Sequence, residues 1–288
     1  MFVFVAVPLS AALGLSSMAI SWELACERLD RAAAMINDTE AVEVEGPIHV
    51  GIDLGTADVV LMAIDAEGEP VAVFLEWAEV VRDGVVVDYV GAIDIVRRFI
   101  KQAEERLGCE ITQASTSFPP GTDARLSINI LESVGLEVTY VEDEPSCVAH
   151  LLDLNKAAIV DIGGGTTGTA VVRNSQVVFS DDEPTGGKHL SLTIAGYYDI
   201  SIEEAEQRKR KAAEFNILSI VRPTLERVTD IVADHIRGQE VETILLSGGT
   251  CCLPGVVGVF EKELKLPIQL PTQPLMLTPF SIASLNLR

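Results

Sequence analysis

The sequence predicts an α/β fold of two similar halves around a cleft, and two observations lead to this prediction. Two short acidic loops that contain glycine, Gly51–Thr56 and Asp161–Gly168, each lie between two apolar runs, about one domain length apart. In each half the order of elements is strand, strand, strand, helix, strand, helix, which is typical of an α/β domain with a mixed sheet. We therefore expect two duplicated βββαβα lobes.

The first half contains these expected elements in chain order. The periodicity of apolar residues and the glycine and proline breaks predict a helix over 22–36, a polar linker over 37–46, strands over 48–53, 57–64 and 70–76, a helix over 93–107, a strand over 111–118, a helix over 123–134, a strand over 137–141 and a helix over 144–152.

After residue 154 the pattern starts again. It predicts strands over 157–162, 168–173 and 176–180, helices over 186–195, 201–214 and 217–236, a strand over 241–246, a helix over 254–264, a strand over 268–270 and a helix over 279–285. Pro223 is expected in the first turn of its helix or at a kink. The predicted units are an N-terminal segment (1–46), lobe I (47–155 plus 275–288) and lobe II (156–274).

Composition limits the classes of function. The 288 residues are enough for two domains, and 48% of them are hydrophobic. The formal charge is 21 − 43 = −22, which opposes binding to nucleic acid, because such proteins need a basic face. A polyphosphate ligand in this chain therefore requires local positive charge or a metal ion.

The five cysteines and the apolar N-terminus bear on the compartment. An odd number of cysteines without CxxC spacing supports neither a disulfide framework nor a zinc site, so we expect reduced thiols. Residues 1–20 carry no charge and have the composition of a membrane anchor or a signal sequence. No basic residue flanks them before Arg28, and Met18 offers an alternative start. We therefore expect a cytoplasmic protein, with membrane contact only if residues 1–20 are a genuine anchor.

The two loops predict a nucleotide site. A strand–turn–strand of this kind directs successive backbone N–H groups toward one point, where they can hold an anion. The aspartates Asp53 and Asp161 would repel a phosphate, so their presence indicates a divalent cation between carboxylate and phosphate. Two such loops indicate one nucleotide held in the cleft between the halves.

Five motifs in order resemble the actin-type ATPase superfamily, to which DnaK-type chaperones, sugar kinases, MreB and FtsA belong. The resemblance covers about residues 48–284. It implies an actin-like ATPase (ribonuclease H-like) fold that binds ATP or ADP with Mg²⁺. The motifs are Asp53-Leu54-Gly55-Thr56, Glu144-Pro145-Ser146-Cys147-Val148-Ala149, Asp161 to Thr167, Leu246-Ser247-Gly248-Gly249-Thr250 and Thr278-Pro279-Phe280-Ser281-Ile282-Ala283-Ser284.

Within that superfamily the chain resembles the EutJ family, the chaperone-like proteins of bacterial ethanolamine utilization. The resemblance implies a protein client, either ethanolamine ammonia-lyase or shell proteins of the bacterial microcompartment, and association with that compartment. The segments that carry it, from about Glu27 onward, are Phe118 to Asp123, Leu131-Glu132-Ser133 with Gly135 to Val138, Val160 to Gly168, and Ser201 to Glu206.

The resemblance assigns roles to particular residues. Asp53 and Asp161 would hold Mg²⁺ through its waters, and Glu144 would orient the attacking water, which makes these three the candidate catalytic residues. Phosphates would be bound by backbone N–H groups of the two loops and by their threonine hydroxyls, and adenosine by a charged helix and two glycine pairs. The candidate nucleotide-binding residues are Gly55, Thr56, Gly163, Gly164, Gly165, Thr166, Thr167, Gly186, Gly187, Glu206, Lys209, Arg210, Gly248, Gly249 and Thr250.

Simpler interpretations stay open for several of these residues. Asp53 could be a turn residue, and Glu144 could serve only the dipole of the helix that it begins. The residues Glu206, Lys209 and Arg210 belong to a highly charged helix and could form a solvated face. The four histidines share no spacing and are interpreted as structural or surface residues.

The chain departs from the superfamily pattern in ways that favour slow turnover. Gly168 stands where DnaK and MreB carry an acidic residue, and Cys252 stands where DnaK has the arginine that stacks on adenine. No lysine lies between Thr56 and Lys101, so the catalytic lysine of DnaK has no counterpart. The short connection between the strand ending near Glu76 and the next helix implies that the outer subdomains are reduced. Slow Mg-dependent ATP hydrolysis or nucleotide-gated switching is expected; an MreB- or FtsA-like filament protein and a small-molecule kinase are the alternatives.

Overall fold

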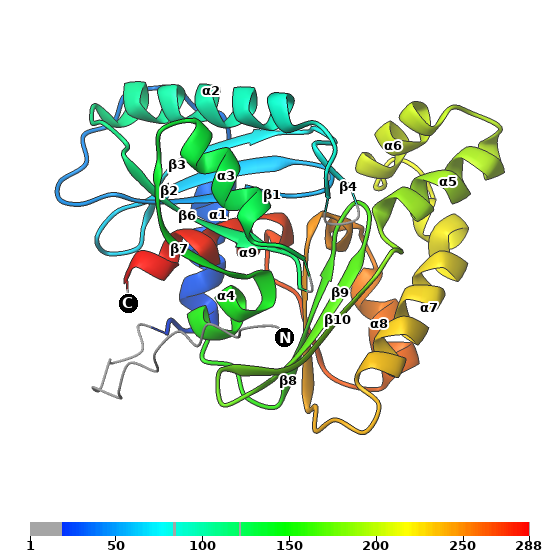
Figure 1. Ribbon diagram of the computed structural model, residues 1–288. Coiled ribbons are helices and arrows are strands. Elements are labelled where there is room, and N and C mark those ends of the chain that lie inside the picture. Colours follow the sequence, from blue (N-terminus) through cyan, green and yellow to red (C-terminus); the bar gives the residue numbers. More distant parts are fainter. Residues whose placement is uncertain (1–18, 83–84, 121, 288) are drawn as a thin grey trace, which may run out of the picture.

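Two five-stranded sheets form the frame of the protein (Figure 1). The computed structural model describes residues 19–287 apart from 83, 84 and 121, so the prediction for the apolar N-terminus lies almost wholly outside the described residues. Within the described ranges, no helix has the length and apolar character needed to cross a bilayer.

The two sheets share one topology. The first has the strand order β3-β2-β1-β6-β7 and the second β10-β9-β8-β11-β12. In each sheet, three strands form an antiparallel meander and two further strands join in parallel. The bounds are β1 His49–Leu54, β2 Val59–Ile64, β3 Pro70–Glu76, β6 Gln113–Phe118, β7 Glu137–Asp143, β8 Ala157–Ile162, β9 Thr167–Arg173, β10 Gln176–Glu183, β11 Thr243–Ser247 and β12 Ile268–Gln269. A small hairpin, β4 Val81–Arg82 and β5 Val85–Val86, follows β3.

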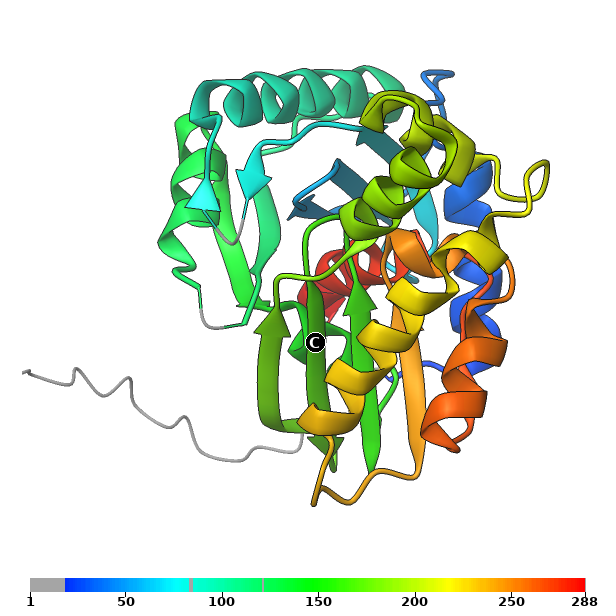
Figure 2. The same ribbon diagram turned by 90° about the vertical axis from the view of Figure 1, so that its right-hand side faces the viewer.

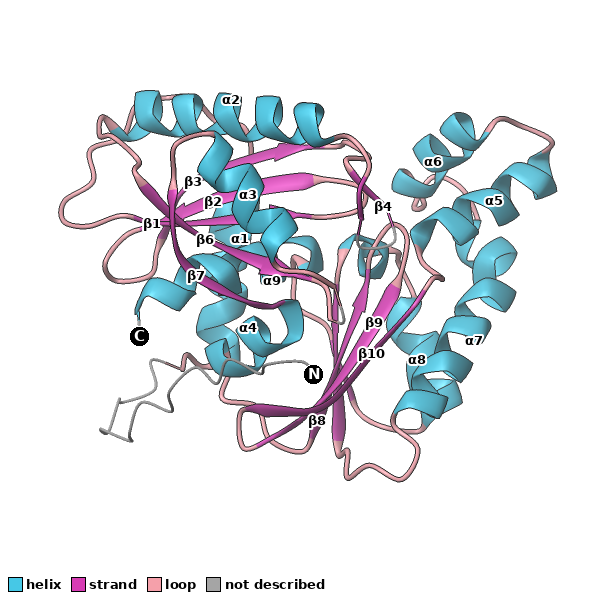
Figure 3. Cartoon of the chain, in the orientation of Figure 1, coloured by secondary structure: helices cyan, strands magenta, loops and turns pink. Residues whose placement is uncertain are grey.

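Helices cover the outer face of each sheet (Figure 3). Strand β2 shows this layering, because successive side chains of a strand point to opposite faces of the sheet. Val59 and Leu61 belong to the core under α2, whereas Val60 and Met62 belong to the core on the opposite face. The first sheet is covered by α2 (Tyr89–Leu107) and α3 (Arg125–Ser133), and the second by α7 (Ile217–His235) and α8 (Val256–Leu264). Helices α5 (Gly187–Tyr198) and α6 (Ile202–Arg210) lie beyond α7, at the edge nearest the first sheet (Figure 2).

A third core joins the inner faces of the two sheets. It contains α1 (Trp22–Ala34), α4 (Glu144–Leu151) and α9 (Pro274–Ala283), packed against apolar residues of both sheets, for example Met62 of β2 and Leu245 of β11. Helix α9 crosses β1 so closely that a Cβ on Gly51 would lie 2.4 Å from the backbone nitrogen of Ala283. The shared core fixes how the two sheets face each other and therefore where their loops meet.

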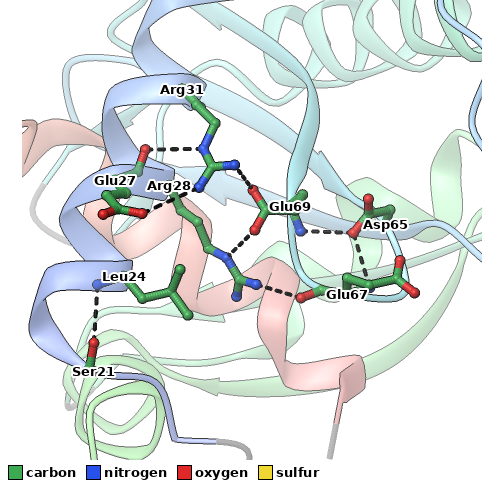
Figure 4. A network of polar contacts seen from close by, with 8 residues as sticks. All are labelled: Ser21, Leu24, Glu27, Arg28, Arg31, Asp65, Glu67 and Glu69. Atoms are coloured by element: carbon green, nitrogen blue, oxygen red, sulfur yellow. Dashed lines mark hydrogen bonds and ion pairs between the residues drawn. The ribbon is translucent and has the colours of Figure 1, made fainter.

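A polar network fastens α1 to the turn between β2 and β3 (Figure 4). The Arg28 side chain, only 9% exposed, pairs with Glu69 at 2.9 Å and donates to the carbonyl of Glu67 at 2.6 Å. Asp65 accepts hydrogen bonds from the backbone N–H groups of Glu67 and Glu69 and so shapes the turn. Arg31 pairs with the second oxygen of Glu69 at 2.6 Å. The predicted first helix is thus bound to the predicted turn.

The structure confirms the predicted order of elements, with differences at several ends. Helix α2 begins at Tyr89, earlier than predicted, because Asp88 caps it by accepting from the Gly91 N–H at 2.9 Å. Helix α9 begins at Pro274 rather than at the predicted 279, because Pro279 lies inside this buried helix and not at its start. Pro223 likewise lies inside α7 beyond its first turn.

Candidate nucleotide site

The two acidic loops meet across the gap between the sheets. The loop after β1 and the loop after β8 are joined by a hydrogen bond from the Gly165 N–H to the Thr56 hydroxyl oxygen, 3.2 Å. A Cβ on Gly164 would lie 2.5 Å from the Cβ of Ala57, so only glycine permits this approach. The prediction that paired hairpins converge on one point is therefore confirmed.

A cavity opens beside the joined loops. Its volume is about 880 Å³, within the usual range of a small-molecule site. It is lined by residues of both loops, of α6 and of the turn after β11. The lining residues named in the sequence analysis are Thr56, Gly163, Gly164, Gly165, Glu206, Lys209, Arg210, Gly249, Thr250 and Cys252.

Helix α6 contributes basic side chains to the cavity wall. Lys209 pairs with Glu206 at 2.6 Å and donates to the carbonyl of Gly187 at 2.9 Å, while Arg210 pairs with Glu206 at 3.0 Å. The Arg210 guanidinium lies 3.9 Å from the centre of the Trp77 ring, which follows β3 in the other sheet. Two basic residues of the charged helix thus face the cavity, and Arg210 reaches across it to the first sheet.

Buried carboxyl groups gather behind the loops. Burial, Asp58 and Asp161 raise the pKa of Asp53 to about 8. Burial and Asp161 raise the pKa of Asp58 to about 6, partly offset by the Arg210 guanidinium. Burial, followed by Asp53, Asp161 and Asp182, raises the pKa of Glu144 well above its usual range. The protein holds these groups together at an electrostatic cost, which a bound cation would remove.

The cluster fits a hydrated cation better than a directly ligated one. Asp161 accepts hydrogen bonds from Ser247 at 2.7 Å and from Thr278 at 3.2 Å, both through Oδ2. The buried Ser117 hydroxyl approaches Asp53 and lowers its pKa, yet makes no well-formed hydrogen bond. In the part of the chain that the structure describes, no three His, Cys, Asp or Glu side chains could ligate one ion. Mg²⁺, which keeps much of its water shell, suits such a site.

Six of the predicted nucleotide-binding residues lie outside the cavity wall, namely Gly55, Thr166, Thr167, Gly186, Gly187 and Gly248. Thr167 is fully buried, and its hydroxyl donates to the carbonyl of Thr185 at 2.5 Å instead of facing the cavity. A Cβ on Gly186 would lie 2.7 Å from the Thr166 nitrogen, one on Gly187 2.5 Å from the Thr250 hydroxyl, and one on Gly248 2.5 Å from Asp161. The absence of a side chain at Gly186, Gly187 and Gly248 therefore allows the second loop and the segments after β10 and β11 to pack closely against one another.

Three residues of the region were missed by the sequence analysis. Asp58 could have been noticed, since it follows the first loop directly and stands before a buried strand. Trp77 and Asp182 carried no local pattern. Trp77 meets Arg210 only through the packing of the sheets, and Asp182 reaches the cluster only through the pairing of β10 with β9.

Comparison with known proteins bears on the family and the fold. Residues 147–280 match the family model of the type IV pilus assembly protein PilM. Ethanolamine utilization protein EutJ of Salmonella typhimurium (strain LT2) is 52% identical over 258 residues, which cover 89% of this chain and 92% of that protein. The crystal structure of EutJ from Carboxydothermus hydrogenoformans is 41% identical, with a TM-score of 0.85 over 91% of this chain and 98% of that one. MreB 5 of Spiroplasma citri bound to AMPPNP has the same fold, with 18% identity and a TM-score of 0.64 over 83% of this chain and 95% of that one. The fold is that of the actin-like ATPases.

Proposed function

The chain belongs to the EutJ family of ethanolamine utilization proteins, and we propose that it is an ATP-binding, chaperone-like switch with slow Mg-dependent hydrolysis. The observation that carries this proposal is the meeting of the two glycine loops beside a cavity of about 880 Å³, with buried carboxyl groups behind them. Backbone N–H groups, carboxylates and basic side chains thus converge on one place, as binding of a nucleotide and a cation requires.

Phosphate binding would use the loop backbone. In this structure the Gly165 N–H donates to Thr56, so a phosphate oxygen would take over this donor and release the Thr56 hydroxyl. Lys209 and Arg210 supply local positive charge at the cavity, which would offset the repulsion between a polyphosphate and the net charge of −22. When bound, Mg²⁺ would neutralise charge between the phosphates and Asp53 and Asp161.

Hydrolysis would depend on Glu144. Glu144 begins α4 within the buried carboxyl cluster, where burial and four neighbouring carboxyl groups raise its pKa, and from this position it would orient the attacking water. Phosphoryl transfer needs mainly positioning and charge stabilisation, and the chain has no lysine between Thr56 and Lys101 to add to the latter. The turnover that we propose is therefore slow, suited to a switch.

Client binding would follow from closure of the cleft. In two-lobed proteins a ligand that contacts both lobes favours the closed arrangement, and here Arg210 already touches Trp77 of the opposite sheet. We propose that the client is ethanolamine ammonia-lyase or a microcompartment shell protein. Co-sedimentation of either purified partner with this protein, in ATP and in ADP, tests this step; equal binding in both nucleotides would refute nucleotide gating.

Calorimetric titration with ATP, with and without Mg²⁺, tests the nucleotide site. We expect Asp161→Ala to lose most of the Mg-dependent affinity, about tenfold or more, while its circular dichroism stays that of a folded protein. Asp230→Ala, at an exposed position on α7, is the control and should bind like the wild type. Equal Mg-dependent binding by the wild type and Asp161→Ala would refute the assigned role.

The likeness to MreB makes a filament the second candidate. Sedimentation of the protein with Mg·ATP distinguishes the two functions. A switch with a −22 charge should stay in the supernatant, whereas robust pelleting that depends on ATP would favour polymerisation.

A further inference from the structure

A row of paired residues crosses three strands of the second sheet at the base of the second loop. Asp161 on β8 is opposite Gly168 on β9, and Gly168 is opposite Asp182 on β10. Residues that pair directly across strands direct their side chains to the same face of a sheet. The two aspartates therefore flank the position where Gly168 has no side chain, with their Cα atoms about 10 Å apart, two strand spacings.

The Asp182 side chain leans into this gap. A Cβ on Gly168 would lie 3.5 Å from Asp182 Oδ1, which is ordinary contact distance. Asp182 is half-buried, and burial followed by Asp161 raises its pKa to about 6, while hydrogen bonding by Thr166 of the second loop lowers it. Its charge also raises the pKa of Glu144. Asp182 thus belongs to the same cluster as the predicted metal residues.

A β-bulge determines which aspartate takes this place. The pairing of β10 with β9 shifts by one residue between Val177 and Phe179. Without that shift Asp181 would oppose Gly168; with it, Asp181 is directed to the other face, where its side chain is 58% exposed beside His235 of α7.

On the opposite side of the cluster, the buried Ser117 hydroxyl lies next to Asp53 and makes no well-formed hydrogen bond. A buried hydroxyl usually has a partner, so this one indicates a further group between the sheets, such as a water of a hydrated cation. This observation is independent of the charges of the cluster.

We propose that Asp182 supplies, from the neighbouring strand, the carboxylate that the second loop lacks at Gly168, and that it orients the waters of the cation bound with ATP. The inference rests on the proposed function and adds a residue to its cation site. Asp182 is a positioning residue, because it acts on the cation through water.

Removing the carboxylate at position 182 and placing one at position 168 tests the inference. We expect Asp182→Asn to weaken Mg-dependent ATP binding by about 10- to 100-fold, the usual effect of an outer-shell group, while binding without Mg²⁺ changes little. Asp181→Asn is the matched control and should behave like the wild type. Adding Gly168→Asp to Asp182→Asn should restore at least tenfold, since a side chain at 168 fits and points into the same gap.

The measurement is calorimetric titration of ATP with Mg²⁺, and again with Mn²⁺, on proteins whose thermal unfolding shows them to be folded. Wild-type and Asp182→Asn proteins with the same Mg²⁺ dependence would overturn this inference alone. Loss of binding without rescue by Gly168→Asp would overturn it as well, because the carboxylate would then act elsewhere. A wild type whose ATP binding ignores Mg²⁺ would overturn the proposed function and this inference together.

Discussion

Replacing Asp58 by asparagine should stabilise the protein in the absence of ligands. Burial and the Asp161 carboxylate raise the Asp58 pKa from 3.8 to about 6. At about 1.36 kcal/mol per pKa unit, the ionised carboxylate costs the folded state about 3 kcal/mol. Asparagine has nearly the same shape and no charge, so Asp58→Asn should gain up to this amount.

The gain should depend on pH in a defined direction. The folded protein holds the Asp58 proton more tightly than the unfolded chain, so the stability of the wild type falls as pH rises from about 3.8 to about 6 and is then level. The advantage of Asp58→Asn over the wild type is therefore about 1 kcal/mol at pH 4.5 and about 3 kcal/mol at pH 7.5.

Urea unfolding followed by far-ultraviolet circular dichroism, without divalent ions, measures this difference at both pH values. Asp230→Asn, exposed on α7, provides the control and should show no gain at either pH. If Asp58→Asn is no more stable than the wild type at pH 7.5, or if its advantage is the same at both pH values, the Asp58 carboxylate does not destabilise the folded protein as described.

Three further predictions concern catalysis, loop geometry and the docking of α1. Glu144→Gln should lower single-turnover ATP hydrolysis by about 10²- to 10³-fold while ATP still binds; unchanged hydrolysis would remove Glu144 from the mechanism. Gly164→Val should force the two loops apart, since its Cβ would lie 2.5 Å from the opposite loop, and calorimetry should show at least about tenfold weaker ATP binding. Gly196→Ala, which has free space around it, should bind ATP normally, and equal loss in both variants would contradict the loop explanation. Arg28→Ala should lower the free energy of unfolding by about 2–3 kcal/mol, because it leaves Glu69 without its buried partner, whereas Arg31→Ala, whose side chain is 50% exposed, should cost less than about 1 kcal/mol; the reverse order would refute the account of this network.

Much of the fold could be predicted because its determinants are local. The unbroken apolar run Val59 to Ile64 indicates a strand with both faces buried, and such a strand needs layers on both sides. The glycines of the two loops and the aspartates at the strand ends are also local features, and they predicted a site that contains both loops. Where a predicted end was wrong, as at Pro279, the folded protein keeps a proline inside a helix that tertiary packing buries at every position except Leu275.

The remaining parts of the site depend on contacts between distant residues. Trp77 and Arg210 carry no motif, and they meet because the shared inner core sets the distance between the sheets. The same packing buries Asp53 and Asp58 and brings them near Asp161, so that burial first and repulsion second raise the pKa of both groups.

Asp181 and Asp182 show where local pattern stops being informative. The sequence places these two adjacent aspartates directly after the predicted strand 176–180, and from the sequence alone either side chain could face the cleft. A single bulged residue in β10 selects Asp182, because side chains alternate between the faces of a strand and a shift of one residue exchanges them. The short motifs of the sequence thus determine which glycines and carboxylates are available to this protein. The pairing of strands in the folded sheet decides which aspartate faces the cluster.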